Sequence, residues 1–444
     1  MEKMAARVES ALETAESERH AVSGAREGLG HVFTTSQIAI LTGGGDRPYA
    51  LGLAGALINQ GVAFDFIGSD ELDDPMLHRS GLVRFLNLRK EMRSKTSRMR
   101  KVVRVLLYYW RLLVYAAKAK PRVFHILWHN KFAIIDRTLV MLYYRAIGKR
   151  IVFTAHNVNA GDRDGNDNVV NRLTLRVQYA LADHIFVHTE QMSLELQRQF
   201  DVTAAKVGVI PFGINSTVPK TALTSSEAKK RLGLAQSDKV VLFFGNIAPY
   251  KGLEYLIEAM RYLAPRSSDY RLIIAGQPKN CESYWNALRE RLSSPELRSW
   301  VIQSIEYVPD GDTEIYFKAA DVLALPYLRI FQSGVLFLGY NFGLPVIASD
   351  VGSLREDIVE GKTGFVCAPG DSVDLAKQIE NYFSGQLYQK LEMRRLDIQK
   401  FANERYSWAK VGDITQQVYK DLLARDGNAP VIRRPSRSAK ATSD

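Results

Sequence analysis

The stretch KVVLFFGNIAPYKGLEYLIEAM, residues 239–260, indicates most clearly how the chain folds. An apolar run rich in valine and phenylalanine ends at Gly245, a loop with Pro249 follows, and apolar residues recur at helical spacing after Gly252. This order predicts a buried strand, a glycine-bearing loop and a helix. Lys251 stands at the helix entry, where its charge adds to outward-pointing N–H groups and suits a diphosphate.

The same alternation continues on both sides of this stretch. Towards the C-terminus, strand-like and helix-like runs follow one another as YRLIIAG, WNALRERL, VIQSIEYV, EIYFKAA, DVLALP, FLGYNFG and LPVIAS. Towards the N-terminus they read QIAIL, ALGLAGALINQG, FDFIG, VFHILW, RTLVMLYYRAIG, RIVFTAH, NRLTLRVQYALA and HIFVHT. Short β-rich runs between helical patterns predict βαβ units and mostly parallel sheets, so we expect an α/β protein.

An aperiodic stretch separates the two series. Residues 207–226, VGVIPFGINSTVPKTALTSS, are rich in proline, serine, threonine and glycine. We therefore place a domain boundary near residues 210–225, which suits two domains of about 150 to 200 residues in a chain of 444. Two doubly wound domains in series leave a crevice between them, and their ligands bind at the carboxyl ends of the strands.

Composition limits the class of protein. With 46% apolar and 24% charged residues and no long uncharged apolar run, the chain is expected to be globular and to lack a membrane-spanning helix. Cys281 and Cys367 lie neither in a CxxC pattern nor near a histidine pair, which argues against a disulfide framework or a structural zinc site. The N-terminus lacks the apolar core of a signal peptide, so a cytoplasmic location is expected.

A second segment offers anion-binding groups at the end of another predicted strand. The sequence YLRIFQSGV, residues 327–335, follows the strand DVLALP and precedes an apolar helix-like run. Ser333 is suited to cap that helix, Gly334 lets a ligand approach the backbone, and Arg329 offers a bidentate phosphate contact. Taken singly, Lys251 is also explained as a solvated residue at a helix start, and Ser333 as a plain cap.

In order and spacing, these motifs resemble those of the retaining glycosyltransferases of the GT-B fold, specifically glycosyltransferase family four. In the second half the resemblance rests on FFGNIAPYKGLEYLIEAM, RLIIAGQP, YVPDGDTEIYFKAADVLALPY, QSGV, FGLPVIASDVGSLREDIVEGKTGFVCAPGD and ERYSW. In the first half it rests on TAHNV, ADHIFVHTE and VIPFGI. The resemblance implies two Rossmann-like doubly wound domains that face each other across a cleft.

The resemblance also implies a division of the chain. An acceptor-binding Rossmann-like domain is expected over residues 34–212 and a nucleotide-sugar-binding one over residues 213–405. A C-terminal helix over residues 406–425 is expected to cross back onto the first domain. Residues 1–33 are interpreted as a polar N-terminal extension, and residues 426–444 as a disordered basic tail.

Residue by residue, the resemblance implies a donor site. Lys251 would bind the donor diphosphate, Ser333 would present N–H groups to it, and His156 of TAHNV would lie beside the transferred sugar. His156 is also explained as a satisfied strand-end histidine, and Glu356 as an exposed acid at a helix start. We assign catalysis to His156 and Lys251. The expected donor-binding set is Gly44, Gly45, Gly245, Asn246, Lys251, Arg329, Gln332, Ser333, Gly334 and Glu356.

Two departures from the family pattern affect the expected site. The family places an arginine five residues before the lysine, or three before it in a close variant, and these positions are Asn246 and Ala248 here. One positive charge expected beside the diphosphate is therefore absent. The usual paired glutamates are replaced by QSGVLFLGYNFG, a recurring variant in which Gln332 would take a polar role near the ribose or phosphate.

The implied reaction is the transfer of a hexosyl group from a UDP- or GDP-sugar to a saccharide acceptor, with retention of anomeric configuration. Lys251 and the N–H groups at Ser333 and Gly334 would stabilise the charge that develops on the leaving diphosphate. No metal or other cofactor is expected, since no DxD motif stands on a strand-end loop and no histidine pair forms a ligand set with carboxylates. Two alternatives stay open: a low-activity scaffold, favoured by Asn246 and Ala248, and a nucleotide-sugar epimerase.

Positive charge is concentrated in residues 89–122. This segment holds twelve lysines or arginines and one glutamate, so it accounts for the whole net charge of +11. Arg100, Arg104 and Arg111 fall on one face of a predicted helix beside the apolar and aromatic run VVRVLLYYWRLLVYAA, in which Trp110 suits a membrane interface.

Such a basic amphipathic helix predicts peripheral binding to the anionic inner face of the cell membrane. With it we expect a polyprenyl-diphosphate-linked acceptor, as in bacterial polysaccharide synthesis. The alternative is a core helix of the first domain with a solvated polar face. Nucleic acid is not expected as a partner, because the charge adjoins continuous apolar surface and no recognition motif accompanies it.

Overall fold

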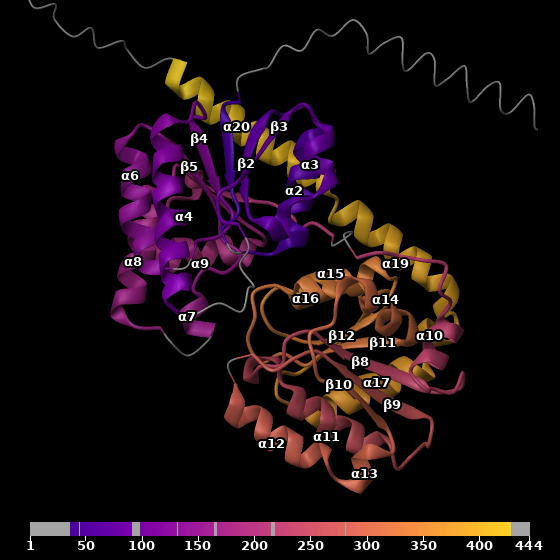
Figure 1. Cartoon of the computed structure of the whole chain (residues 1–444). Helices are drawn as coiled ribbons and strands as arrows, with labels where there is room; N and C mark the ends of the chain where they lie inside the picture. The colour runs from indigo at the N-terminus through magenta and orange to yellow at the C-terminus, as the bar shows by residue number, and fades with distance from the viewer. Residues whose placement is uncertain are drawn as a thin grey trace, which may run out of the picture.

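Two parallel β-sheets, one in each lobe of the molecule, organise the chain (Figure 1). The computed structural model describes residues 36–43, 45–90, 98–130, 132–163, 167–214, 218–279 and 281–427. Within them the first sheet consists, in spatial order, of β3 (Val83–Asn87), β2 (Phe64–Gly68), β1 (Ile38–Leu41), β4 (Val123–Ile126), β5 (Arg150–Thr154), β6 (His184–Val187) and β7 (Val207–Val209). The second consists of β10 (Val301–Ser304), β9 (Tyr270–Ala275), β8 (Lys239–Phe244), β11 (Val322–Leu325), β12 (Val346–Ser349) and β13 (Gly364–Cys367).

Both sheets have the doubly wound strand order of a Rossmann-like fold. Each begins with a central strand, and the order reverses between β1 and β4 in the first sheet and between β8 and β11 in the second. Ligands of such sheets bind outside the carboxyl ends of the strands at this point of reversal. The topology confirms the expected fold class, an α/β protein with two Rossmann-like domains.

Helices cover both faces of each sheet (Figure 1). The strands are therefore apolar along their length, and Val240 and Val241 of β8 pack into different core clusters on opposite faces. The helices are α2 Arg47–Asn59, α3 Pro75–Arg79, α4 Arg98–Lys118, α5 Ala133–Ile135, α6 Met141–Ala146, α7 Ala160–Arg163, α8 Val169–Leu181, α9 Glu190–Phe200, α10 Ser225–Arg231, α11 Leu253–Leu263, α12 Glu282–Leu292, α13 Pro295–Arg298, α14 Asp310–Ala319, α15 Gly334–Asn341, α16 Leu354–Asp357, α17 Ser372–Ser384, α18 Gln386–Gln389, α19 Leu391–Arg405 and α20 Trp408–Gly427. Short 3-10 turns are η1 Asp70–Leu72, η3 Ala204–Lys206 and η4 Pro249–Lys251, and η2 Asp136–Val140 is a π-helical segment.

Helix α2 begins earlier than its apolar pattern indicates. The pattern ALGLAGALINQG starts at Ala50, whereas the helix starts at Arg47. The carboxylate of Asp46 caps the helix by accepting a hydrogen bond from the Tyr49 amide at 3.4 Å. Pro48 occupies the first turn, where its missing N–H breaks no helical hydrogen bond. This early start places Asp46 and Tyr49 at the edge of the first lobe.

The chain crosses between the lobes twice, and the two crossings touch. The first crossing carries Phe212, Gly213 and Ile214, and the second joins α19 to α20. Trp408, the first residue of α20, donates a hydrogen bond from its indole Nε1 to the carbonyl of Ile214 at 2.8 Å. Helix α20 then packs on α2 of the first lobe, as Figure 1 shows. The amide of Gln60 holds it there by donating to Asp413 at 2.6 Å.

Helix α4 turns an apolar face to solvent. Tyr108 and Leu112 pack into the core of the first lobe, whereas Leu106 and Trp110 are 60% and 67% exposed. Arg100 is exposed at the start of this helix. The alternative interpretation of α4, a core helix with a polar outer face, is therefore half right. One side of α4 packs into the core, but its outer face is largely apolar rather than polar.

Neighbouring helices extend this face of the first lobe. Helices α4, α6 and α8 lie on the same side of it in Figure 1, and the ring of Tyr109 on α4 stacks on that of Phe132 at 5.9 Å. The exposed apolar side chains there are Val102, Val103, Leu106, Leu107, Trp110, Phe132, Ile134, Ile135, Leu139, Leu142, Val169, Val170 and Leu173, which we call the apolar face. No helix within the described ranges is both long and apolar enough to cross a membrane.

Candidate functional site

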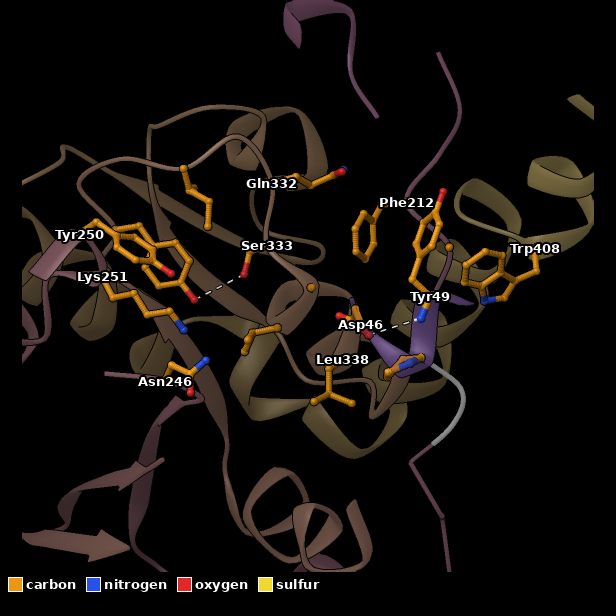
Figure 2. Close-up of a pocket in the computed structure, with 16 residues that line it drawn as sticks. Asp46, Tyr49, Phe212, Asn246, Tyr250, Lys251, Gln332, Ser333, Leu338 and Trp408 are labelled. Atoms are coloured by element: carbon orange, nitrogen blue, oxygen red, sulfur yellow. Dashed lines mark hydrogen bonds between the residues drawn. The ribbon is translucent and has the colours of Figure 1, made fainter. Parts of the chain in front are cut away.

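The two lobes enclose a cavity of about 380 Å³, which we call the main cavity. Its walls come from the start of α2, the first crossing, the loops after β8 and β11, the start of α15 and the start of α20 (Figure 2). The cavity thus lies at the carboxyl end of the second sheet, opposite the first lobe. The lining residues are Asp46, Pro48, Tyr49, Phe212, Gly213, Asn246, Tyr250, Lys251, Tyr327, Ile330, Gln332, Ser333, Gly334, Val335, Leu338 and Trp408.

Lys251 brings a buried cation to the main cavity. It ends the short turn η4, is only 6% exposed, and its Nζ lies 5.4 Å from the centre of the Tyr327 ring. Gly245 at the end of β8 has a φ of 95°, and a Cβ there would lie 3.3 Å from the ammonium. Glycine at this position therefore keeps the space beside Lys251 open.

Ser333 stands at the start of α15 but does not cap it. Its backbone occupies the N-cap position, yet its side chain makes no capping hydrogen bond and donates instead towards the Tyr327 hydroxyl at 3.4 Å. The interpretation of Ser333 as a plain helix cap is therefore wrong. Because the first N–H groups of a helix have no intrahelical partner, those at Gly334 and Val335 offer donors where both residues line the main cavity.

Gln332 and Asn246 add amide groups to the same cavity. The Oε1 atom of Gln332 is buried and has no hydrogen-bond partner within the part of the chain that the structure describes. Gln332 also neighbours Asp357, whose pKa burial raises to about 6 while hydrogen bonds from Tyr406 and Gln332 act in the opposite direction. A buried oxygen without a partner is costly, so Gln332 is suited to accept a hydrogen bond from a ligand.

A second cavity of about 240 Å³ adjoins the main cavity and shares Asn246 and Leu338 with it. It lies at the carboxyl ends of β8, β9 and β10, where Gly276 approaches the β8 backbone with a φ of 146°. The other lining residues are Val218, Phe244, Gly245, Ala275, Gln277, Glu306, Tyr307, Val308, Asp310 and Thr313. The two cavities thus lie side by side along the carboxyl edge of the second sheet.

Four expected donor-binding residues, Gly44, Gly45, Arg329 and Glu356, lie away from the main cavity or outside the described residues. Arg329 is exposed and lines a separate cavity between the lobes, together with Asp162 and Glu195. Glu356 is exposed on α16, and its backbone carbonyl accepts a hydrogen bond from Arg405 at 3.1 Å. Gly44 lies outside the described residues. The structure thus gathers Asn246, Lys251, Gln332, Ser333 and Gly334, with Gly245 beside them.

His156 and Gly45 both pack against Trp128. The rings of His156 and Trp128 stack with centroids 4.1 Å apart and planes 6° apart, and a Cβ on Gly45 would overlap the indole. Tyr49 lines the main cavity and meets His156 edge-on, whereas His156 itself is not among the lining residues. Burial, followed by the neighbouring His188 and His125, holds the pKa of His156 well below its usual range, so its ring is neutral.

Sequence reasoning missed several lining residues. Asp46 and Tyr49 follow the glycine turn that the sequence marks, and burial raises the pKa of the Asp46 carboxyl. Phe212 and Trp408 belong to the motifs VIPFGI and ERYSW, which indicate the family but do not by themselves mark these two residues as part of the site. Within the described residues, no group of three or more His, Cys, Asp or Glu side chains is placed to hold a metal ion.

Solved structures share this two-lobed arrangement. Sucrose-phosphate synthase from Thermosynechococcus elongatus superposes with a TM-score of 0.69 at 18% identity, over 88% of this chain and 100% of that one. HepE from Anabaena, solved in complex with UDP, gives a TM-score of 0.64 at 16% identity, over 87% of this chain and 100% of that one. At these identities the likeness concerns the fold, which is that of the GT-B class.

Family models place the chain within that class. The model of glycosyl transferases group 1 matches residues 238–384, and the model of glycosyltransferase family 4 matches residues 43–218. The chain belongs to glycosyltransferase family 4. Curated relatives include the D-inositol 3-phosphate glycosyltransferases of Corynebacterium urealyticum, 26% identical over 58% of this chain, and of Corynebacterium diphtheriae, 25% identical over 62% of it. The alignments span 61% and 66% of these relatives, less than two thirds of each.

Proposed function

We propose that the protein transfers a hexosyl group from a nucleotide-diphosphate sugar to a saccharide acceptor. One observation carries this proposal: buried Lys251 and the uncapped start of α15 at Ser333 and Gly334 line the same cavity. A cation and free helix N–H groups together form a site for a diphosphate. The adjoining cavity at the ends of β8, β9 and β10 then takes the nucleoside.

Charge development explains how this site accelerates transfer. When the anomeric bond breaks, the departing diphosphate gains negative charge, and Lys251 and the N–H groups of α15 stabilise it more strongly than they stabilise the intact donor. We propose retention of anomeric configuration, with the acceptor hydroxyl attacking from the face that the diphosphate leaves. The leaving phosphate takes the acceptor proton, so no side chain is assigned as general base. His156 lies beside the transferred sugar in this proposal.

The apolar face supports a lipid-linked acceptor. It combines the exposed apolar side chains with Arg100 at the start of α4. The apolar side chains can be buried in a lipid interface, and the anionic charge of that surface attracts the arginine. We therefore propose that the first lobe binds the acceptor at the inner face of the cell membrane, as a peripheral protein. A polyprenyl-diphosphate-linked saccharide, of the kind used in bacterial polysaccharide synthesis, fits this position.

A donor screen tests the proposed activity. UDP- and GDP-sugars are added singly, thermal stability is measured, and release of the free nucleotide is then followed with a mixture of saccharide acceptors. We expect at least one sugar nucleotide to raise the melting temperature and to be consumed. Stabilisation without consumption would favour a scaffold of the same fold, and conversion of one sugar nucleotide into another would favour an epimerase. No response to any nucleotide would contradict the proposal.

A further inference from the structure

Two carboxylates line the second cavity, the one that shares Asn246 with the main cavity. Glu306 follows β10 and Asp310 begins α14, so both stand at the carboxyl edge of the second sheet. Among the described residues that line this cavity there is no lysine or arginine. The second cavity therefore offers negatively charged hydrogen-bond acceptors to the group that it binds.

The protein itself engages these carboxylates only weakly. Glu306 is exposed and makes no hydrogen bond or ion pair with any residue of the described ranges. Asp310 forms an ion pair with Arg47 of the first lobe at 3.9 Å. Arg47 makes closer bonds within its own lobe, because it donates to the carboxylate of Asp74 and to the carbonyl of Glu71, both at 3.0 Å. Both carboxylates thus remain available to a ligand.

The other walls of the second cavity suit the flat ring of a nucleobase. Tyr307 is 53% exposed and lines the cavity, and Phe244 and Val308 add apolar surface. An aromatic side chain can stack on any base, because every base has a π-face. Stacking therefore does not select among nucleosides. Selection depends on the polar groups that meet the edge of the base, and of these the carboxylates form the strongest hydrogen bonds.

The donors on the edge of a base decide which nucleoside fits such a wall. Guanine carries two adjacent donors, N1–H and the N2 amino group, which match the two oxygens of a carboxylate. Uracil has a single donor, N3–H, between two carbonyl oxygens that repel a carboxylate. Adenine and cytosine each place a ring nitrogen with a lone pair beside their amino group. Guanine is thus the base that a carboxylate can bind in a bidentate manner.

We propose that Glu306 and Asp310 select guanine, so that the sugar donor is a GDP-sugar. This inference rests on the proposed function for the presence of a sugar nucleotide, and it adds the identity of the base. The wall formed by the two carboxylates accepts the protons of guanine N1 and N2. The same negative charge disfavours uracil, because the carbonyl oxygens of uracil would face it.

Isothermal titration of the full chain with four nucleoside diphosphates tests the selection. The probes are GDP, UDP, ADP and inosine diphosphate, which differs from GDP only in lacking the N2 amino group. We expect GDP to bind at least about tenfold more tightly than each of the other three, since one hydrogen bond to a charged group accounts for that factor. Equal binding of GDP and inosine diphosphate, or tighter binding of UDP or ADP than of GDP, would overturn the inference.

A double variant tests whether the two carboxylates cause the selection. Glu306→Gln with Asp310→Asn keeps the shape of both side chains but replaces one acceptor of each by a donor. We expect GDP to bind at least about tenfold more weakly and no more tightly than inosine diphosphate. UDP should bind at least as tightly as to the wild type, which also shows that the variant is folded, because an amide can donate to a uracil carbonyl.

The matched control carries Glu290→Gln and Asp312→Asn. These acids are exposed on α12 and α14 and do not line the second cavity, so the preference for GDP should be kept. Wild-type preference for GDP in the first double variant, or equal losses in both variants, would overturn the role of the carboxylates. If no nucleoside diphosphate binds the wild type, the proposed function itself fails. If UDP binds best, the proposed function stands and the assignment of guanine alone is wrong.

Discussion

Ser333 illustrates how a single side chain separates a structural role from a ligand-binding role. A serine at an N-cap normally accepts a hydrogen bond from the helix backbone, which stabilises the helix. Here the hydroxyl points towards Tyr327 and the backbone groups at Gly334 remain available at the main cavity (Figure 2). Asp371 at the start of α17 shows the usual arrangement, since its carboxylate accepts from the amides of Val373 and Asp374 at 2.9 and 3.0 Å.

Substitution of these two residues, which both occupy N-cap positions, should have different consequences. Ser333→Ala is expected to change the free energy of unfolding by less than about 0.5 kcal/mol because no capping bond is lost, whereas Asp371→Ala should cost about 1 kcal/mol. Urea unfolding of both variants measures the difference. A loss of stability in Ser333→Ala as large as that in Asp371→Ala would show that Ser333 acts as a cap in solution.

The buried His125 predicts a pH dependence of stability. Its ring nitrogens hydrogen-bond to the hydroxyls of Tyr419 and Thr154 at 2.6 and 2.7 Å, and burial lowers its pKa to about 3 from an ordinary value of 6.5. The unfolded chain therefore binds more protons than the folded one between pH 3 and 6.5, so this contribution to stability is complete above pH 6.5 and is lost as pH falls.

Measurement of unfolding free energy from pH 7 to pH 5 checks this expectation. One such histidine adds up to about 1.4 kcal/mol per pH unit to the slope of the unfolding free energy against pH. The slope of His125→Gln should therefore be smaller than that of the wild-type protein by about this amount. The variant is less stable at pH 7, so only the slopes are compared. Parallel curves for the two proteins would mean that His125 titrates normally in the folded state.

The sequence predicted part of the site at this scale and missed the rest for a physical reason. Lys251, Ser333 and Gly334 were predictable because helix starts after strands mark ligand positions in doubly wound sheets. Tyr49 and Trp408 were not, because aromatic side chains at helix starts serve cores far more often than cavities. Only the approach of the two lobes turns them into walls of the site.

At the scale of elements, the packing of α20 on α2 depends on two glycines that face one tryptophan. A Cβ at Gly52 of α2 or at Gly213 of the first crossing would overlap the indole of Trp408. Gly52→Ala gains helix propensity of about 1 kcal/mol, but overpacking of a filled core costs about 1 to 3 kcal/mol. The second effect is larger, so the variant should be destabilised.

Gly311 of α14 provides the matched control, because a Cβ there meets no atom within 4 Å. Gly311→Ala should leave the melting temperature unchanged or raise it, whereas Gly52→Ala should lower it and shift the fluorescence of Trp408. Thermal unfolding and emission spectra of both variants provide the test. An unaltered melting temperature in Gly52→Ala would mean that α20 does not pack on α2 as described.

The apolar face predicts binding to anionic vesicles. Replacement of Arg100, Arg104 and Arg111 by glutamine removes attraction of about 1 kcal/mol for each charge and should weaken binding by about a hundredfold or more. The control replaces Arg289, Arg291 and Arg298 of the second lobe, which removes the same charge elsewhere. Vesicle sedimentation with phosphatidylglycerol measures both. Equal binding by the two triple variants would count against a membrane role for α4.

Strand prediction was least complete where strands are short or partly exposed. β3 and β7 have no fully buried position, and β7 spans three residues, so neither carries the continuous apolar run that marks β8. β13 begins at Gly364, where a Cβ would overlap the carbonyl of Val346, and the strand is defined chiefly by its pairing with β12. Such strands depend on a neighbour for their hydrogen bonds, which local sequence does not encode.

At the scale of the whole molecule, the site exists only where the lobes meet. The diphosphate-binding groups come from the second lobe, and Asp46, Tyr49 and the paired crossings close the main cavity from the other side. The two-domain plan was predictable from the repeated strand and helix alternation and from the aperiodic stretch near residue 210. The separation of Arg329 from the cavity was not, because loop paths depend on packing across the interface.

The central claim is that Lys251 and the start of α15 form a diphosphate site. Isothermal titration of wild-type protein with UDP and UMP, and with GDP and GMP, tests it most directly, with Lys251→Ala and the exposed Lys362→Ala as the matched pair. We expect one diphosphate to bind at least about tenfold more tightly than its monophosphate, a difference of about 1.4 kcal/mol that Lys251→Ala abolishes and Lys362→Ala preserves. Equal affinity for monophosphate and diphosphate, or a preference that survives in Lys251→Ala, would contradict the account.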